Sequence, residues 1–101
     1  WYSRQRWDAV PLVELFDDEA IAGARSIAVT SATGYRRLFP VRDVGDVWLA
    51  VGYDGRPLRP GHGAPVRIVA PGRRGPWWVK WVTGIELSDR PWWLQAPLPT
   101  T

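Results

Sequence analysis

The sequence predicts an α+β fold made mostly of antiparallel β-strands, with one or two short helices. Short apolar and β-branched runs recur along the chain, Gly/Pro-rich turns separate them, and a helical pattern occurs in only one stretch near the N-terminus. The chain has 101 residues and an apolar content of 46%, which is enough for the core of one small domain. We therefore expect residues 1–101 to belong to a single domain.

The N-terminal third contains the helical pattern and a predicted hairpin. Residues 1–9 show no clear period. In residues 11–18 the apolar side chains share one helical face, and Pro11 suits the first helical position because its missing N–H would be unpaired there. The runs 26–31 and 35–41 flank a short Gly-containing turn, which is typical of a β-hairpin.

The remaining strands are expected in the C-terminal two thirds. A strand at 47–53 ends at Asp54-Gly55, a dipeptide that favours a type I′ turn because both central residues need positive φ. A second strand is predicted at 65–70. Residues 79–87 are expected to form one long strand, interrupted by a bulge near Gly84.

The charge of the chain argues against a nucleic-acid partner. The net charge is +3 and the isoelectric point is about 10.0. Twelve of the thirteen cationic residues are arginine, but they are scattered among acidic residues rather than gathered into a stripe. Scattered charge is typical of a solvated surface, so a basic nucleic-acid-binding β-domain is the weakest hypothesis.

Several residue types are missing. With no cysteine, this segment has no disulfide framework, zinc ribbon or thiol nucleophile. No apolar run is long enough to cross a membrane, so any membrane contact is expected from segments outside these residues. The chain starts at Trp1 and contains no methionine, so we expect a part of a longer protein that extends on the N-terminal side.

The stretch 48–87 carries the candidate binding residues. It holds the only histidine, His62, and the only lysine, Lys80, with Arg67 between them. Three cations on adjacent strands and loops would converge on one anion. The alternatives are an exposed loop histidine, an arginine on a solvated strand face, and a lysine whose stem reaches water past its tryptophan neighbours.

The two pairs of adjacent tryptophans have both structural and functional interpretations. Trp77-Trp78 and Trp92-Trp93 suit core packing or contact with other parts of the parent protein, and a stacking wall for a flat heterocycle is the functional alternative. Other types of site are excluded because the sequence lacks the motifs that they require. One histidine without cysteine makes no usual zinc site, and the sequence has no Walker loop, Rossmann fingerprint or Gly-x-Ser-x-Gly.

A set of motifs gives the chain a family resemblance. The blocks occur in order and with regular spacing: Leu49-Ala50, Tyr53-Asp54-Gly55-Arg56-Pro57-Leu58, His62-Gly63-Ala64-Pro65-Val66-Arg67, Pro71-Gly72 and Val79-Lys80-Trp81. Together they resemble the molybdopterin-binding domain of the sulfite oxidase family. Two earlier landmarks extend the likeness over most of the chain: Trp7-Asp8-Ala9-Val10-Pro11-Leu12 and Gly34-Tyr35.

The resemblance implies a cofactor, a site and a class of reaction. His62, Arg67 and Lys80, with backbone near Val79, would bind the phosphate end and pyranopterin of a molybdenum cofactor in the full-length parent. That parent would carry out two-electron redox chemistry on a small molecule, with oxygen-atom transfer at molybdenum. It would exchange the electrons with a separate electron-transfer partner. Many relatives work outside the cytoplasm or beside a membrane anchor, so the resemblance implies such a location.

The chain departs from the family pattern at two points, of which the second leads to a rival hypothesis. Asp54 stands where the family often has asparagine, and the family's molybdenum-ligating cysteine is absent from this chain. We expect that cysteine upstream of Trp1. The rival is a non-catalytic binding or assembly module that keeps the fold without the metal. A cysteine a few residues before Trp1 in the parent gene would favour the enzyme.

Overall fold

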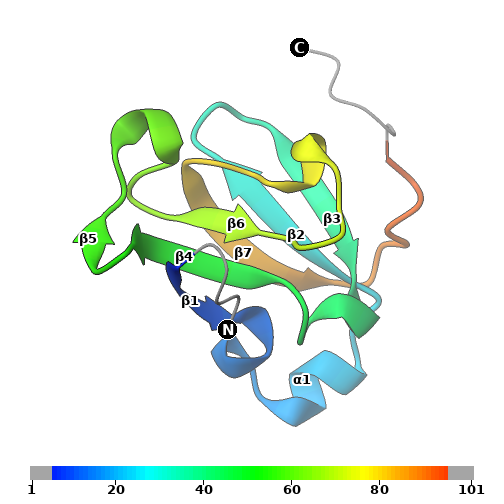
Figure 1. Cartoon of the computed structure of the whole chain (residues 1–101). Coiled ribbons are helices and arrows are strands. Elements are labelled where there is room, and N and C mark those ends of the chain that lie inside the picture. The colour runs from blue at the N-terminus through cyan, green and yellow to red at the C-terminus, as the bar shows by residue number, and fades with distance from the viewer. Residues whose placement is uncertain (1–5, 96–101) are drawn as a thin grey trace.

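The computed structural model describes residues 6–95, which form two antiparallel sheets (Figure 1). In the four-stranded sheet, β4 pairs with each of the other three strands. In the three-stranded sheet, β2 lies between β3 and β7. The strands are β1 (Trp7–Pro11), β2 (Ser26–Ser31), β3 (Arg36–Pro40), β4 (Trp48–Tyr53), β5 (Arg56–Pro57), β6 (Arg67–Val69) and β7 (Val82–Ser88).

Helical structure is confined to short pieces, so the predicted α+β class with dominant strands is confirmed. The only α-helix in the described residues is α1 (Asp18–Ala22). The 3₁₀ turns are η2 (Leu12–Leu15), η3 (Val41–Asp43), η4 (Pro60–His62) and η5 (Gly75–Trp77). The predicted hairpin at 26–31 and 35–41 is present as β2 and β3, with five residue pairs in register.

The expected helix at 11–18 is present only as a 3₁₀ turn, and the α-helix lies after it. The segment begins as the 3₁₀ turn η2, and the α-helix starts only at Asp18. Tertiary bonds explain the difference, because the N–H groups of Leu12 and Val13 donate to the carbonyls of Val47 and Val44 at 2.8 and 2.9 Å. The α-helix then begins at its own cap, where Asp17 Oδ1 accepts from the N–H of Ala20 at 2.9 Å.

Side chains from both sheets and from η2 meet in one core. Ile27, Val29 and Phe39 come from the three-stranded sheet, Ile68 comes from β6, and Leu12 comes from η2; all five are completely buried. Burying one such side chain stabilises a fold by about 1.5–3 kcal/mol. The core thus holds β6, and with it Arg67, against the other sheet.

The expected long strand at 79–87 begins only at Val82. Before it, the carbonyl of Val79 accepts from Ile68 N–H at 2.7 Å, and Val82 N–H donates to the Val66 carbonyl at 3.0 Å. The segment therefore lies along β6 first and joins β2 afterwards. Trp81, at φ 53°, makes the change of direction. The register shift expected near Gly84 is present, because Thr30 pairs with Gly84 and Ser31 with Val82.

The β4–β5 hairpin has the predicted turn. Asp54 and Gly55 both have positive φ, 53° and 80°. Strand β1, which lies in a segment without a periodic signal, supports this turn, because Asp8 Oδ2 accepts from Gly55 N–H at 2.8 Å. This bond fixes the end of the sheet that carries β5.

Replacing Asp8 by alanine tests this support. The loss of the bond to Gly55 is expected to lower the free energy of unfolding by about 1 kcal/mol. Asp8→Asn keeps an oxygen acceptor and should lose less. Chemical denaturation of the three proteins measures the difference. Equal destabilisation by alanine and asparagine would contradict the role of the acceptor.

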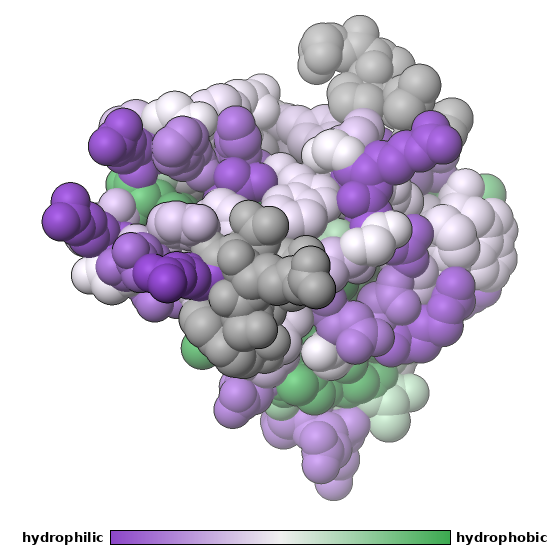
Figure 2. All heavy atoms as spheres, in the orientation of Figure 1, coloured by the Kyte–Doolittle hydropathy of each residue, from purple (hydrophilic) through white to green (hydrophobic). Residues whose placement is uncertain are grey.

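The surface is mostly polar on the face that Figure 2 shows, with hydrophilic atoms crowded at the end of the sheet that carries β5. The larger hydrophobic area on that face lies over the short helices η2 and α1, where Leu15 is 44% exposed. Within residues 6–95, no helix has both the length and the apolar character needed to cross a membrane.

Candidate anion-binding site

The histidine loop is a single 3₁₀ turn that ends at a left-handed glycine. Pro60 opens η4, His62 closes it with an exposed side chain, and Gly63 follows at φ +107°. A β-carbon on Gly63 would lie 2.8 Å from Arg67 Cβ and 3.2 Å from Lys80 Cγ. The loop therefore rests directly on the stems of both cations, and this close approach requires glycine.

Arg67 is the buried cation of the group. It is 9% exposed, and its Cζ lies 5.0 Å from the ring of Trp7 and 5.5 Å from that of Trp78. Its Nη1 donates to the carbonyl of His62 at 3.1 Å, and its Nε to that of Ile68 at 3.3 Å. The sequence alternative of a solvated strand face is therefore wrong for Arg67.

No carboxylate within the described residues balances this charge. The ion pairs that the structure shows there involve Arg6, Arg36 and Arg73, and none involves Arg67. Burial lowers the pKa of the Arg67 guanidinium, because desolvation disfavours its charged form. An arginine nevertheless stays protonated at neutral pH, so a buried positive charge without a carboxylate partner in residues 6–95 faces this site.

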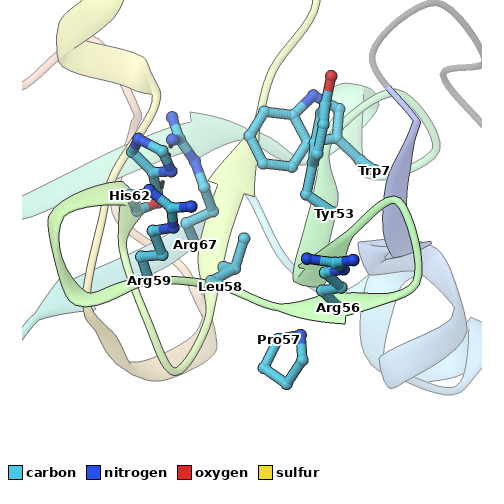
Figure 3. A pocket seen from close by; sticks show the side chains of 8 residues that line it. All are labelled: Trp7, Tyr53, Arg56, Pro57, Leu58, Arg59, His62 and Arg67. Carbon is cyan, nitrogen blue, oxygen red and sulfur yellow. Dashed lines mark hydrogen bonds between the residues drawn. The ribbon is translucent and has the colours of Figure 1, made fainter.

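A pocket of about 450 Å³ opens beside Arg67 (Figure 3). In Figure 3, Arg59, His62 and Arg67 are grouped on one side, and Trp7 and Tyr53 on the other. Arg56, Pro57 and Leu58 complete the lining. Among the described residues the pocket thus has three arginines, a histidine and two aromatic rings, but no acid, which is the composition of an anion site with an aromatic wall.

Lys80 and Val79 line a neighbouring pocket of about 360 Å³ rather than this one. Lys80 Nζ donates to the carbonyl of Gly61 at 3.2 Å and lies 5.8 Å from the ring of Trp81. Val79 is 3% exposed. The pocket beside Arg67 and the pocket beside Lys80 are therefore separate within residues 6–95. The structure brings His62 and Arg67 together, and the histidine loop links them to Lys80.

Sequence reasoning did not single out several of the pocket's residues. Arg59 lies in the Pro/Gly-rich loop, and nothing distinguishes it from the chain's other arginines, while Arg56, in β5, appeared only within a family motif. Trp7 and Tyr53 appeared only as family landmarks. The ring centroids of Trp7 and Tyr53 are 5.1 Å apart, edge to face, because β1 and β4 pair these two residues directly. That pairing was not visible without the register of the sheet.

Comparison with known families identifies the domain to which these residues belong. The family described as oxidoreductase molybdopterin binding domain matches residues 1–94. The chain belongs to this family. Molybdopterin is the family's cofactor, and the match covers every strand and pocket described above.

Individual proteins of known activity also share sequence similarity with this molybdopterin-binding domain. The chain is 50% identical over 42 residues to the NADPH nitrate reductase of Mycosarcoma maydis, covering 42% of the chain and 4% of the relative. It is 44% identical over 46 residues to the mitochondrial sulfite oxidase of Drosophila melanogaster, covering 46% of the chain and 8% of the relative. The chain therefore spans less than a tenth of the length of these relatives.

A solved structure has the same fold. The sulfane dehydrogenase SoxCD from Paracoccus pantotrophus superposes with a TM-score of 0.68 at 35% sequence identity. The match covers 80% of this chain and 22% of that one. The predicted sulfite-oxidase-like fold is thereby confirmed.

The residues present fit a phosphate-bearing pterin. Arg67 supplies a buried charge that lacks a counter-ion among the described residues, the pocket beside it has a cationic lining, and Gly63 leaves no side chain between the loop and the two stems. A phosphate dianion needs about two or three charge-assisted donors, and this donor set provides them. The rings of Trp7 and Tyr53 provide apolar area for a flat heterocycle.

Proposed function

We propose that His62, Arg67, Val79 and Lys80 hold the phosphate end and pterin of a molybdenum cofactor in a molybdenum oxidoreductase. The observation that carries this proposal is the burial of Arg67 without an acidic partner in the described part of the chain. Leaving a charge buried and unpaired is costly, and an anionic ligand removes that cost.

The donors still free at the site support this assignment. A guanidinium has five N–H groups, of which Arg67 donates its Nε–H to the carbonyl of Ile68 and one Nη1 proton to that of His62. An ammonium has three, and Lys80 uses one on Gly61. His62, whose side chain is exposed at the end of η4, adds a ring N–H donor. The remaining N–H groups have no acceptor within residues 6–95 and would donate to phosphate oxygens.

The cofactor and the residues of this chain would have different roles. Molybdenum bound to the pterin dithiolene would supply two-electron redox chemistry, with oxygen-atom transfer to or from a small molecule. The residues of this chain would hold and orient the cofactor, and Trp7 and Trp78 would keep water from Arg67. The thiolate ligand would come from elsewhere in the parent, since the 101 residues contain no cysteine.

The absence of cysteine also favours a second candidate. A domain that keeps the fold and the cationic pocket without a thiolate would serve as a binding or assembly module. It would still bind a phosphate-bearing pterin but would lack molybdenum. The two candidates therefore differ in molybdenum content rather than in fold.

Metal and pterin analysis of the full-length gene product separates the candidates. The protein is produced in a host that synthesises the molybdenum cofactor, and molybdenum is measured by mass spectrometry. Pterin is measured by fluorescence after oxidative release. The enzyme is expected to carry molybdenum and pterin in equal amounts. Pterin without molybdenum would identify the binding module. A protein with neither pterin nor molybdenum would overturn both candidate functions.

Lys80 provides a graded test of the site. Lys80→Ala is expected to weaken cofactor binding roughly ten- to a hundredfold, since a hydrogen bond to a charged group contributes about 1.5–3 kcal/mol. Lys80→Arg keeps the charge and should retain most of the bound pterin. Pterin content after dialysis measures both. If the Lys80→Ala protein keeps its full pterin content, Lys80 does not bind the cofactor.

A further inference from the structure

The indole N–H of Trp7 is a buried donor that lacks an acceptor. Among residues 6–95, Trp7 Nε1 is the only buried side-chain nitrogen or oxygen atom without a hydrogen-bond partner. A buried tryptophan N–H normally has a partner, because an unpaired buried donor keeps the full cost of its desolvation. The acceptor for this proton is therefore expected from a group other than these residues.

The other tryptophan at Arg67 has an acceptor for its N–H. The guanidinium carbon of Arg67 lies 5.5 Å from the ring centroid of Trp78 and 5.0 Å from that of Trp7. Trp78 Nε1 donates to the carbonyl of Arg73 at 3.0 Å. Contact with a guanidinium uses the face of an aromatic ring, which phenylalanine also has. The contact with Arg67 therefore accounts for an aromatic ring at position 7 but not for its nitrogen.

Trp7 belongs to the wall of the pocket beside Arg67. It lines that pocket together with Tyr53, on the side away from His62 and Arg59 (Figure 3). Among the described residues, the lining has no carboxylate or carboxamide that accepts the indole proton. A neutral N–H suits a neutral acceptor, whereas guanidinium groups bind anions more strongly. The two sides of the pocket therefore fit different parts of a ligand.

We propose that the Trp7 indole N–H donates to a carbonyl oxygen or an unprotonated ring nitrogen at the edge of a heterocycle held in this pocket. The inference rests on the proposed function and adds an orientation to it. The phosphate end of the ligand lies toward Arg59, His62 and Arg67. The heterocycle lies toward Trp7 and Tyr53.

Trp7 then makes the pocket selective for the ring of the ligand and not only for its charge. A pterin carries a carbonyl oxygen and unprotonated ring nitrogens, so it satisfies the indole N–H. A ring whose edge is hydrocarbon, or presents only donors, leaves that N–H unpaired, and an unpaired buried donor lowers affinity.

The same substitution at the two tryptophans tests whether the nitrogen of Trp7 is needed for the fold. The full-length gene product is made without pterin, in a host that lacks molybdenum-cofactor synthesis. Trp7→Phe and Trp78→Phe each leave a smaller ring on Arg67. Trp78→Phe also loses the bond to the Arg73 carbonyl, whereas Trp7→Phe removes an unpaired donor. Chemical denaturation should therefore show Trp78→Phe to be the less stable protein.

Pterin content should rank the two variants in the opposite order. In a host that makes the cofactor, Trp7→Phe is expected to weaken pterin binding roughly five- to tenfold, the effect of one lost hydrogen bond. Trp78→Phe should lose less, although its fold is weaker. Pterin is measured by fluorescence after equal dialysis. Equal pterin loss in the two variants would show that contact with Arg67, and not the N–H, is what Trp7 provides, and would overturn the inference.

The indole N–H resonance of Trp7 gives the direct readout. It is identified in ¹H–¹⁵N spectra by its loss in Trp7→Phe, and a downfield shift is expected in the pterin-loaded protein relative to the pterin-free one. The Trp78 resonance should move less, because its acceptor belongs to the chain. An unshifted Trp7 resonance in loaded protein would overturn the inference and leave the proposed function standing. Wild-type protein without any pterin would overturn both.

Discussion

Arg67→Ala is expected to reduce cofactor binding by the full-length protein roughly ten- to a hundredfold, because it removes the buried charge and at least one charge-assisted bond to the phosphate. The substitution also deletes the group that Trp7 and Trp78 stack upon. Molybdenum and pterin contents are measured side by side after equal dialysis. Thermal unfolding of the same samples shows whether the fold persists.

Two control variants make the Arg67 result specific. Arg74→Ala removes an exposed arginine that lies outside both described pockets and should leave the cofactor content unchanged. Arg67→Lys keeps a charge but loses the planar fork, so it should fall between alanine and wild type. A folded Arg67→Ala protein with full cofactor content would contradict the site.

Gly63→Ala is expected to damage both stability and binding. At φ +107° an alanine is strained by about 1–3 kcal/mol. Its β-carbon would also lie 2.8 Å from Arg67 Cβ, so the histidine loop must move off the stems of Arg67 and Lys80. Chemical denaturation and pterin content are both expected to change, because the same displacement breaks the bond from Arg67 to the His62 carbonyl.

Gly72→Ala separates the steric effect from the backbone effect. Gly72 also has a positive φ, +85°, but a β-carbon there meets nothing within 4 Å. It should therefore lose stability through strain alone and keep its cofactor. Equal losses of pterin in Gly63→Ala and Gly72→Ala would show that the contact between Gly63 and the two stems does not matter for binding.

Local patterns were reliable wherever neighbouring residues decide the structure. The β2–β3 hairpin and the Asp54-Gly55 turn follow from β-branched runs and from a dipeptide that tolerates positive φ. The interruption near Gly84 was visible for a similar reason, because glycine in a strand marks a bulge. Each of these signals lies within a few residues of the feature it predicts.

Predictions were wrong where distant segments compete for the backbone. The helical pattern at 11–18 is real, but Val44 and Val47 accept the N–H groups of Val13 and Leu12 and leave only a 3₁₀ turn. Likewise, residues before Val82 bond to the flanks of β6 before the chain joins β2. Periodicity reports which face is apolar, not which carbonyl lies within reach.

The sequence by itself determined the family and the strand-rich class, because motif spacing and turn residues are local properties, and it singled out His62, Arg67 and Lys80 as candidate site residues. Only the tertiary structure decided that Arg67 is buried against Trp7 and Trp78, and that Lys80 faces a neighbouring pocket. The reason is physical. Burial and charge compensation depend on strand register and on packing between two sheets, which join residues far apart in the chain.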